Sequence, residues 1–398
     1  MRSYLKILYL GLFTLYNLLY AFYMGGILPR MIYMASLLLV TLFSGTVVAL
    51  RYRRTGAARR SLAMALLIPI VFFAISLICQ ASNRDFQGYL ITELLYFIVP
   101  PIVAYAGVDI LNDREYHALF YIVFAKLVLF FLLKNRSTLS LSLILNISFS
   151  NSDSSAFEML IAHDFFLMMI LFTFFRKPLA ALLSFGMCLI TFKRLPFLLA
   201  IVFLLLMVVI QILWLCGYRG IKGRLTNWIL KPPSNKFVCF VTIGFLLAPI
   251  VMKLTYSPLG AELFRNLLHM DLNKFTSGRY NIVNYALENA AVNGLGSITH
   301  FYENFGGKYV DIGNMHCDVL RLAMEVTYFG FGFYALVLTK LFRRNRLSFY
   351  FLCYAILELM FSHVADNLNL WMLLYLVLAF TEKTVHTETT HAETEEGR

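Results

Sequence analysis

A polar segment, residues 253–321, interrupts a chain that is otherwise strongly apolar, and it concentrates residue types that can do chemistry. Within it, Arg279 lies in the first turn of an expected helix over 278–292, with Ser277 as the expected N-cap. The first turn of a helix presents free backbone N–H groups and the positive end of the helix dipole. An arginine at that position is therefore suited to binding the oxygen atoms of a phosphate.

His316 stands at the start of the next expected helix, with Asn314 as a candidate cap. The two helix starts, one carrying Arg279 and the other His316, can converge on a single anion. The alternative is that Arg279 anchors the segment at the membrane interface and that His316 is a hydrogen-bonded loop residue. The spacing of the two residues along the chain does not decide between these interpretations.

Three charged residues follow His316 at helical spacing. Asp318 and Arg321 are three residues apart, and Arg321 and Glu325 are four apart, so the side chains share one helix face. Charges that enter a membrane span need partners. For Arg321 and Glu325 we expect a mutual ion network, whereas Asp318 is a candidate for chemistry as well.

A second basic pair, Lys193 and Arg194, ends an apolar run on the side of the membrane where positive charges are not favoured. The pair either binds an anionic ligand at the edge of the membrane or snorkels to the interface. The outer segments contain no DxD sequence and no carboxylate cluster that would hold Mg²⁺ or Mn²⁺. No pair among the six cysteines has zinc-ligand spacing, so we expect neither a metal nor another cofactor.

The elements that position these residues are apolar helices. Charged residues make up 14% of the chain, against about 25% in a soluble domain. Twelve apolar runs have about the length of a membrane-crossing helix. They cover 6–26, 31–50, 61–79, 88–107, 118–133, 156–175, 178–192, 195–216, 237–255, 319–341, 347–362 and 367–381. We therefore expect an all-α integral membrane protein, a polytopic bundle of about 12 transmembrane helices with one large periplasmic loop that contains short helices.

The orientation follows from lysine and arginine. With the N-terminus in the cytoplasm, the inner segments hold 21 of these residues and the outer segments 12, six of them in the polar segment. By the positive-inside rule both termini are cytoplasmic, and the large loop, about 254–318, lies on the other side. The net charge of +12 follows mainly from this topology and does not predict nucleic-acid binding.

We expect one transmembrane catalytic domain over 1–381 and a polar, disordered cytoplasmic tail over 382–398. In the large loop, residues 259–275 gather leucine and phenylalanine on one face. This pattern predicts an amphipathic helix that lies on the membrane or on the bundle, so membrane lipids are expected partners.

Four short motifs, taken together with their order and location in the chain, resemble the bacterial O-antigen polymerase (Wzy) and O-antigen ligase (WaaL) superfamily. They are His316-x-Asp-x-Leu-Arg-x-x-x-Glu325 with Gly330, Thr-Ser-Gly-Arg-Tyr at 276–280, Asn-Gly-Leu-Gly at 293–296, and Lys193-Arg194-Leu-Pro. The chain departs from the family pattern at three places. Cys317 stands where asparagine is common, Thr327 replaces the first of two glycines, and Val292-Asn293 replaces Asn-Pro.

The resemblance implies an inner-membrane glycosyltransferase of the GT-C type that acts without a metal on undecaprenyl-diphosphate-linked oligosaccharides at the periplasmic face. Expelling a lipid diphosphate needs preorganised cations. The resemblance assigns this task to Arg279, with Arg194, Lys193 and Ser277 as further diphosphate-binding residues. His316 either donates to the diphosphate or accepts the proton of the acceptor hydroxyl, and Asp318 is the third candidate catalytic residue.

Two reactions of this superfamily remain open. A polymerase joins a growing glycan to another lipid-linked repeat unit, whereas a ligase transfers the finished glycan to lipid A-core. The departures from the histidine motif favour the polymerase, for which a chain-length regulator and a flippase of the same pathway are candidate partners. The alternative from another class is a polytopic transporter or flippase, because polar residues within the spans and Pro100-Pro101 also fit such a protein.

Overall fold

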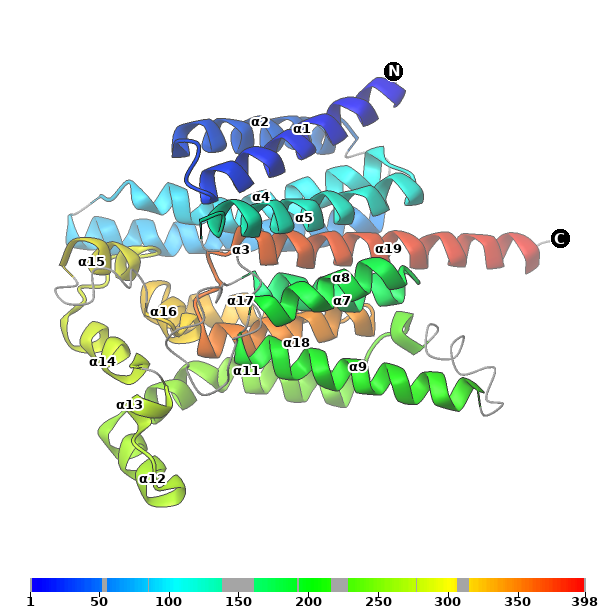
Figure 1. The fold of residues 1–398 in the computed structure, drawn as a ribbon. Coiled ribbons are helices and arrows are strands. Elements are labelled where there is room, and N and C mark those ends of the chain that lie inside the picture. Colours follow the sequence, from blue (N-terminus) through cyan, green and yellow to red (C-terminus); the bar gives the residue numbers. More distant parts are fainter. Residues whose placement is uncertain are drawn as a thin grey trace. The chain divides into compact units, whose positions relative to one another are not determined.

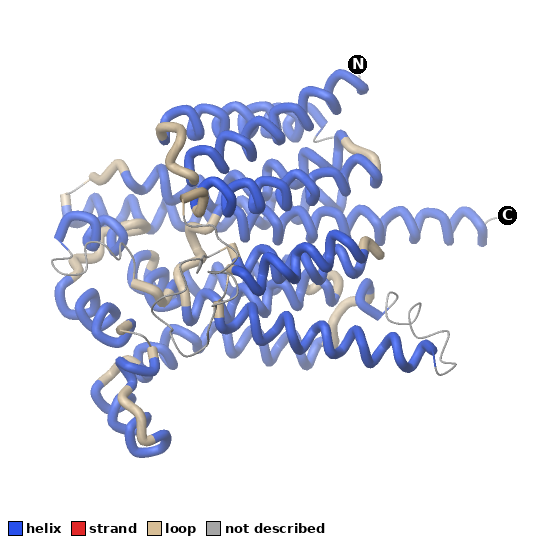
Figure 2. The backbone as a smooth tube through the Cα atoms, viewed as in Figure 1, coloured by secondary structure: helices blue, strands red, loops and turns tan. Residues whose placement is uncertain are grey.

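The structure is a computed structural model that describes residues 2–51, 56–84, 86–137, 161–191, 193–215, 228–276, 278–305 and 315–396. Over these ranges every regular element is a helix and none is a strand (Figures 1 and 2). The longer helices are α1 (Arg2–Met24), α2 (Arg30–Arg51), α3 (Gly56–Asn83), α4 (Tyr89–Ile110), α5 (Asp113–Lys134), α7 (Ala162–Phe174), α8 (Pro178–Ile190), α9 (Arg194–Leu215), α11 (Asn235–Thr255), α17 (Thr327–Phe342), α18 (Arg346–Phe361) and α19 (Leu368–Glu396). The shorter ones are α12 (Pro258–Leu268), α13 (Leu272–Phe275), α14 (Arg279–Asn289), α15 (Ser297–Phe305) and α16 (Asp318–Glu325).

Several of these helices have the length and composition of membrane spans. In the described part of the chain, seven helices qualify, namely α1 to α5, α9 and α11, while α7, α8 and α17 are apolar but shorter. Many apolar side chains on these helices are exposed, as Val202 and Leu205 of α9 are at 60% each, which suits contact with lipid. The all-helical class predicted from the sequence is confirmed over the described residues, and the seven candidate spans are consistent with a polytopic membrane protein. The number of twelve spans and the orientation stay predictions.

The chain divides into two compact units, and α4 and α19 each contribute to both. The first unit comprises Met1–Arg54, Ile102–Leu230 and Lys383–Arg398. In it α1 packs against α2 and α5, and α7 packs against α8 and α9. The hydroxyl of Tyr9 donates to the carbonyl of Val103 at 2.7 Å, which links α1 to the second half of α4.

The second unit comprises Thr55–Pro101 and Lys231–Glu382 and holds most of the candidate site. Its centre is α17, which packs against α3, α11, α16 and α18. Aromatic rings of α3, α4, α11 and α17 meet in tilted and edge-on pairs, the arrangement that the ring quadrupole favours. They belong to Phe72, Phe97, Phe245, Phe331 and Tyr334.

The expected span 319–341 is not one helix, because α16 ends at Glu325 and α17 begins at Thr327. Thr327 has a left-handed backbone, with φ of 63°, which is an unfavourable conformation for a β-branched residue. Glu325 Oε1 accepts a hydrogen bond from the Ile298 N–H at 2.9 Å and so ties the end of α16 to the polar segment. The charged face of α16 is buried among polar partners, and this explains why the helix stops before the apolar α17 starts.

The polar segment also differs from the expectation in its helices. The expected helix 259–275 is broken into α12 and α13, because His269 adopts a left-handed φ of 52° and Asp271 caps α13 by accepting from the Lys274 N–H at 3.1 Å. The helix carrying Arg279 is present as α14, but its N-cap is Gly278 and not Ser277. A further helix, α15, was not expected.

The last helix continues past the expected end of the twelfth span at residue 381 and runs to Glu396. Two ion pairs hold the helix at this point. Glu382 lies 3.0 Å from Arg344, and Lys383 lies 2.9 Å from Asp113. The disordered tail expected for 382–398 stays a prediction.

Candidate functional site

Arg279 opens α14 and reaches the end of α18. Its Nη1 donates a hydrogen bond to the carbonyl oxygen of Phe361. The side chain is half-buried, and its charge acts on the buried Cys317 and Tyr256. Arg279 therefore belongs to a site shared by α14, α16 and α18. A residue that only anchored the segment at the membrane interface would not need these contacts.

His316 lies two residues ahead of α16 and has a left-handed φ of 53°. Its ring stacks on the ring of His363, with the centroids 5.1 Å apart and the planes inclined by 25°. Arg279 and His316 are far apart in the sequence, yet both contact the short stretch 361–363. The two predicted residues are thus brought to one place by the connection between α18 and α19.

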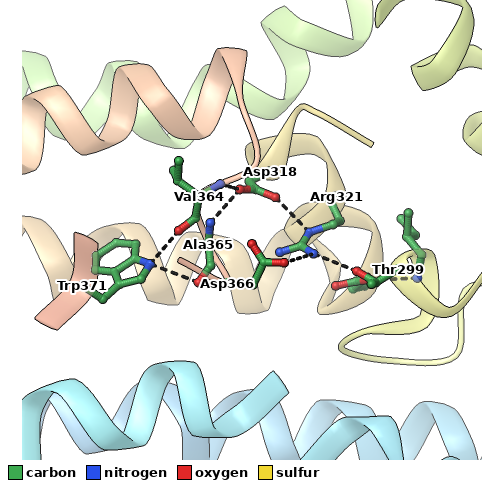
Figure 3. A network of polar contacts seen from close by, with 9 residues as sticks. Thr299, Asp318, Arg321, Val364, Ala365, Asp366 and Trp371 are labelled. Atoms are coloured by element: carbon green, nitrogen blue, oxygen red, sulfur yellow. Dashed lines mark hydrogen bonds and ion pairs between the residues drawn. The ribbon is translucent and has the colours of Figure 1, made fainter. Parts of the chain in front are cut away.

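Asp318 is completely buried and fully engaged (Figure 3). Its Oδ1 lies 3.0 Å from Arg321 Nε, the pair that the three-residue spacing predicts. Its Oδ2 accepts hydrogen bonds from the backbone N–H groups of Val364 and Ala365, the latter at 2.7 Å. Asp318 therefore clamps the chain immediately after His363.

The indole of Trp371 fixes the same stretch from the other side. Its Nε1 donates to the carbonyl oxygens of Val364 and Ala365 at 3.1 and 3.0 Å, as Figure 3 shows. Both peptide groups are consequently held on the donor and on the acceptor side. A buried backbone segment needs such partners, and here they give His363 a fixed position.

Arg321 is only 1% exposed and binds several partners besides Asp318. Its Nη1 donates to Thr299 Oγ1 at 2.9 Å and lies 4.0 Å from the carboxylate of Asp366 (Figure 3). Glu325 and Glu93 also act on the guanidinium electrostatically. Four carboxylates thus surround one cation, and the expected network between Arg321 and Glu325 is larger than the sequence indicated.

Two glycines let the polar segment approach α3 and α4 closely. Gly294 and Gly296 have left-handed φ angles of 92° and 85°. A Cβ atom at Gly294 would lie 2.8 Å from the Cβ of Ser76, and one at Gly296 would lie 2.7 Å from Cγ of Glu93. These close approaches place Ile298 and Thr299 against the charged face of α16.

Cys317, between His316 and Asp318, has no exposed surface. The pKa of its thiol is raised to about 12, mainly by burial and to a smaller extent by the Asp318 carboxylate, while a backbone hydrogen bond with Leu320 and the charge of Arg279 oppose the rise. The thiol therefore stays protonated near neutral pH. Cys317 is a packing residue at this position and not a nucleophile.

The remaining predicted site residues belong to the first unit or are not described. Lys193 and Arg194 belong to the first unit, where Arg194 is exposed and opens α9, whereas Arg279, His316 and Asp318 belong to the second. Ser277 is outside the described residues. A joint contact of these three residues with one diphosphate stays a prediction.

Sequence reasoning missed His363, Asp366 and Thr299. The segment Ser362–Asn367 is a short polar break between two apolar runs, and this break is the signal that could have drawn attention to His363 and Asp366. Thr299 gives no such signal, because it lies in α15. That helix was detectable from Ile298, Phe301 and Tyr302, which are spaced like one helix face and are buried.

No group of three or more His, Cys, Asp and Glu side chains placed to hold a metal ion occurs in the described part of the chain. The sequence matches no protein-family model, no curated protein and no solved structure.

Proposed function

We propose that the chain is a glycosyltransferase of a bacterial inner membrane, with both termini cytoplasmic. In this proposal it polymerises undecaprenyl-diphosphate-linked oligosaccharide repeat units at the periplasmic face and releases undecaprenyl diphosphate. The observation that carries the proposal is the meeting of Arg279 and His316 at residues 361–363. These are two of the three residues for which the motif resemblance implies catalysis, the third being Asp318.

The chemistry requires cations where a diphosphate departs. The bond between the anomeric carbon and the phosphate oxygen breaks, and negative charge develops on the diphosphate. Arg279 supplies a planar guanidinium at a helix start, where free N–H groups add to its attraction for phosphate oxygens. In this proposal Arg194, Lys193 and Ser277 provide further contacts to the same diphosphate.

Asp318 acts in this proposal as a positioning residue. Both of its carboxylate oxygens are engaged, one by Arg321 and the other by two backbone N–H groups. A carboxylate so occupied is poorly placed to accept a proton from a substrate hydroxyl. Its contribution to the reaction is to hold α16, and with it His316, against the stretch that follows α18.

The deciding experiment is the lipopolysaccharide gel profile of a strain that lacks the gene. For the polymerase we expect a single repeat unit on the core, seen as one band above bare core. Bare core alone, with long glycan accumulating on the carrier lipid, would identify the ligase instead. An unchanged ladder would reject both and favour the transporter or flippase.

Site variants test the assignment directly. We expect Arg279→Ala and His316→Ala each to abolish glycan transfer while leaving expression near normal, and Arg279→Lys to fail largely because an ammonium cannot reproduce the guanidinium fork. Arg265→Ala is the matched control, since Arg265 is an exposed arginine of the same segment that pairs with Asp271 at 3.7 Å. Full activity of the Arg279 and His316 alanine variants would contradict the assignment.

Transfer should not need a metal ion. Asp318, two residues after His316, lies 3.0 Å from Arg321, and Asp366, Glu325 and Glu93 also act on this cation. Purified protein supplied with lipid-diphosphate-linked repeat units should therefore stay active in excess EDTA. Loss of activity that Mg²⁺ or Mn²⁺ restores would contradict this prediction.

A further inference from the structure

His363 has no place in the motifs that drew attention to Arg279 and His316. It lies in the connection between α18 and α19, nearly fifty residues after His316. Nevertheless its ring stacks on that of His316, and Arg279 bonds to the carbonyl oxygen of Phe361 two residues before it. Two imidazoles and one guanidinium therefore gather at one place in the second unit.

The backbone around His363 is held more firmly than a loop residue requires. The N–H groups of the next two residues are bound by Asp318, and the carbonyl oxygens of the same two residues accept from Trp371. Figure 3 shows this double clamp on Val364 and Ala365. Such fixed placement is what a group that must meet a reacting atom needs.

The imidazole itself is free to engage a ligand. Nδ1 of His363 is buried and has no hydrogen-bond partner among the described residues. The residue as a whole is only half-buried, so part of the side chain is open to a ligand. The groups that face the ring are the stacked His316 and, electrostatically, the carboxylate of Asp318.

The two histidines differ in their charged neighbours. His316 adjoins Cys317, on which the positive charge of Arg279 acts, and a cationic neighbour suits a residue that helps to hold a diphosphate. His363 instead has the Asp318 carboxylate as its charged neighbour. A nearby carboxylate stabilises an imidazolium. Of the two histidines, His363 is therefore the better candidate for accepting a proton.

We propose that His363 is a second catalytic histidine, the general base that accepts the proton of the acceptor sugar hydroxyl, while His316 and Arg279 hold the diphosphate. This inference rests on the proposed function. The acceptor oxygen forms a bond to the anomeric carbon of the donor sugar, and its proton passes to the imidazole of His363. The bond from that carbon to the phosphate oxygen breaks, and the electron pair leaves with the lipid diphosphate.

The test measures transfer and binding separately on the purified full-length protein. Transfer uses lipid-diphosphate-linked repeat units, and binding uses inorganic pyrophosphate as a competitor of that reaction. We expect His363→Gln to lower kcat about 10²- to 10⁴-fold, the usual contribution of a general base, with KM for the donor and inhibition by pyrophosphate nearly unchanged. We expect His316→Ala to weaken inhibition by pyrophosphate.

Chemical rescue separates catalysis from structure. Added imidazole should restore part of the turnover of His363→Ala but not that of His316→Ala. His300→Ala is the matched control, because His300 stacks on Tyr89 at 4.9 Å in the same unit and should behave like the wild type.

Each outcome decides between the two proposals. A wild-type protein that transfers no glycan overturns the proposed function and this inference with it. An active wild type with a fully active His363→Gln variant overturns only the inference. A raised KM at unchanged kcat in the His363 variants would make His363 a binding residue. Loss of both transfer and pyrophosphate inhibition, without rescue by imidazole, would make it a structural residue. Either result also overturns the assignment of His363 as the general base.

Discussion

The guanidinium of Arg321 is almost completely buried, and its neighbours determine the free-energy cost of that burial. Removing such a group from water is expensive unless its donors are bonded and its charge is balanced. Thr299 accepts a hydrogen bond from one of its nitrogens, Asp318 forms an ion pair with another at 3.0 Å, and Asp366, Glu325 and Glu93 add negative charge. The charge balance depends on Arg321, because without it the four carboxylates would face one another with no cation between them.

We therefore expect Arg321→Met to lower the free energy of unfolding strongly, by about 3–5 kcal/mol, the usual cost of removing one partner of a buried pair. The added change Glu325→Gln should recover part of this loss, since it removes one uncompensated carboxylate and keeps an oxygen for the Ile298 N–H. Thermal unfolding in detergent of the single and double variants measures this coupling. Additive effects of the two substitutions would contradict the account.

Cys317 gives a second prediction at this scale. A thiol with a pKa of about 12 has very little thiolate at neutral pH, and the thiolate is the reactive form. In a variant that keeps Cys317 alone, reaction with a maleimide at pH 7.5 should be slow until the protein is denatured. Asn266→Cys, an exposed position of α12 in a cysteine-free background, should react at once and is the control. Fast labelling of native Cys317 would show that the site is more open than the structure has it.

Among the elements, the stretch from Asn293 to α15 has the greatest influence on the site. It places the Thr299 hydroxyl where it accepts a hydrogen bond from Arg321, and the Ile298 N–H where it donates one to Glu325. It also packs on α14, where the Tyr302 hydroxyl donates to the Ile282 carbonyl at 2.5 Å. The position of α14, and hence of Arg279, is therefore coupled to the close approach that the two glycines permit.

We expect Gly296→Ala to lower the free energy of unfolding by about 2–4 kcal/mol, because the new Cβ meets Glu93 and Tyr89 and an L-residue resists a φ of 85°. Glycan transfer should fall with it. Gly244→Ala in α11 is the matched control, since nothing lies within 4 Å of its added Cβ and the stability should be unchanged or slightly higher. Thermal unfolding in detergent compares the two, and equal melting temperatures would contradict the packing argument.

The sequence was sufficient to predict elements with a strong apolar pattern. It was insufficient where contacts between distant segments determine the local structure. A helix occupies each of the twelve expected ranges at least in part, and of the two expected helix starts the structure has Arg279 at the start of α14 but His316 two residues before α16. The break at Val326 was not foreseeable, because it depends on Glu325 bonding to Ile298 in another helix. His363 escaped notice for the same reason, since its importance comes from stacking on His316 and not from its neighbours in the chain.

At the scale of the whole molecule, the second unit has two chemically different ends. The candidate site lies where α11 leads into α12 and where α16 begins. The other end is basic, because α11 starts near Lys236 and the connection from α17 to α18 carries Arg343 and Arg344. A backbone hydrogen bond of 2.9 Å from the Arg346 N–H to the Lys231 carbonyl brings these two basic segments together. The positive-inside rule then assigns the basic end to the cytoplasm and the site to the opposite face.

Labelling of single cysteines in intact cells tests this orientation. In a cysteine-free background, Asn266→Cys on α12 and Arg343→Cys in the connection from α17 to α18 are both exposed positions at opposite ends of the unit. A membrane-impermeant maleimide should label the first from outside and the second only after the inner membrane is broken. Both variants should retain glycan transfer, since neither residue touches Arg279, His316 or His363. Labelling of Arg343→Cys with protection of Asn266→Cys would invert the topology. The candidate site would then face the cytoplasm, where a reaction on periplasmic lipid-linked glycans cannot occur, and the proposed function would fail together with the orientation.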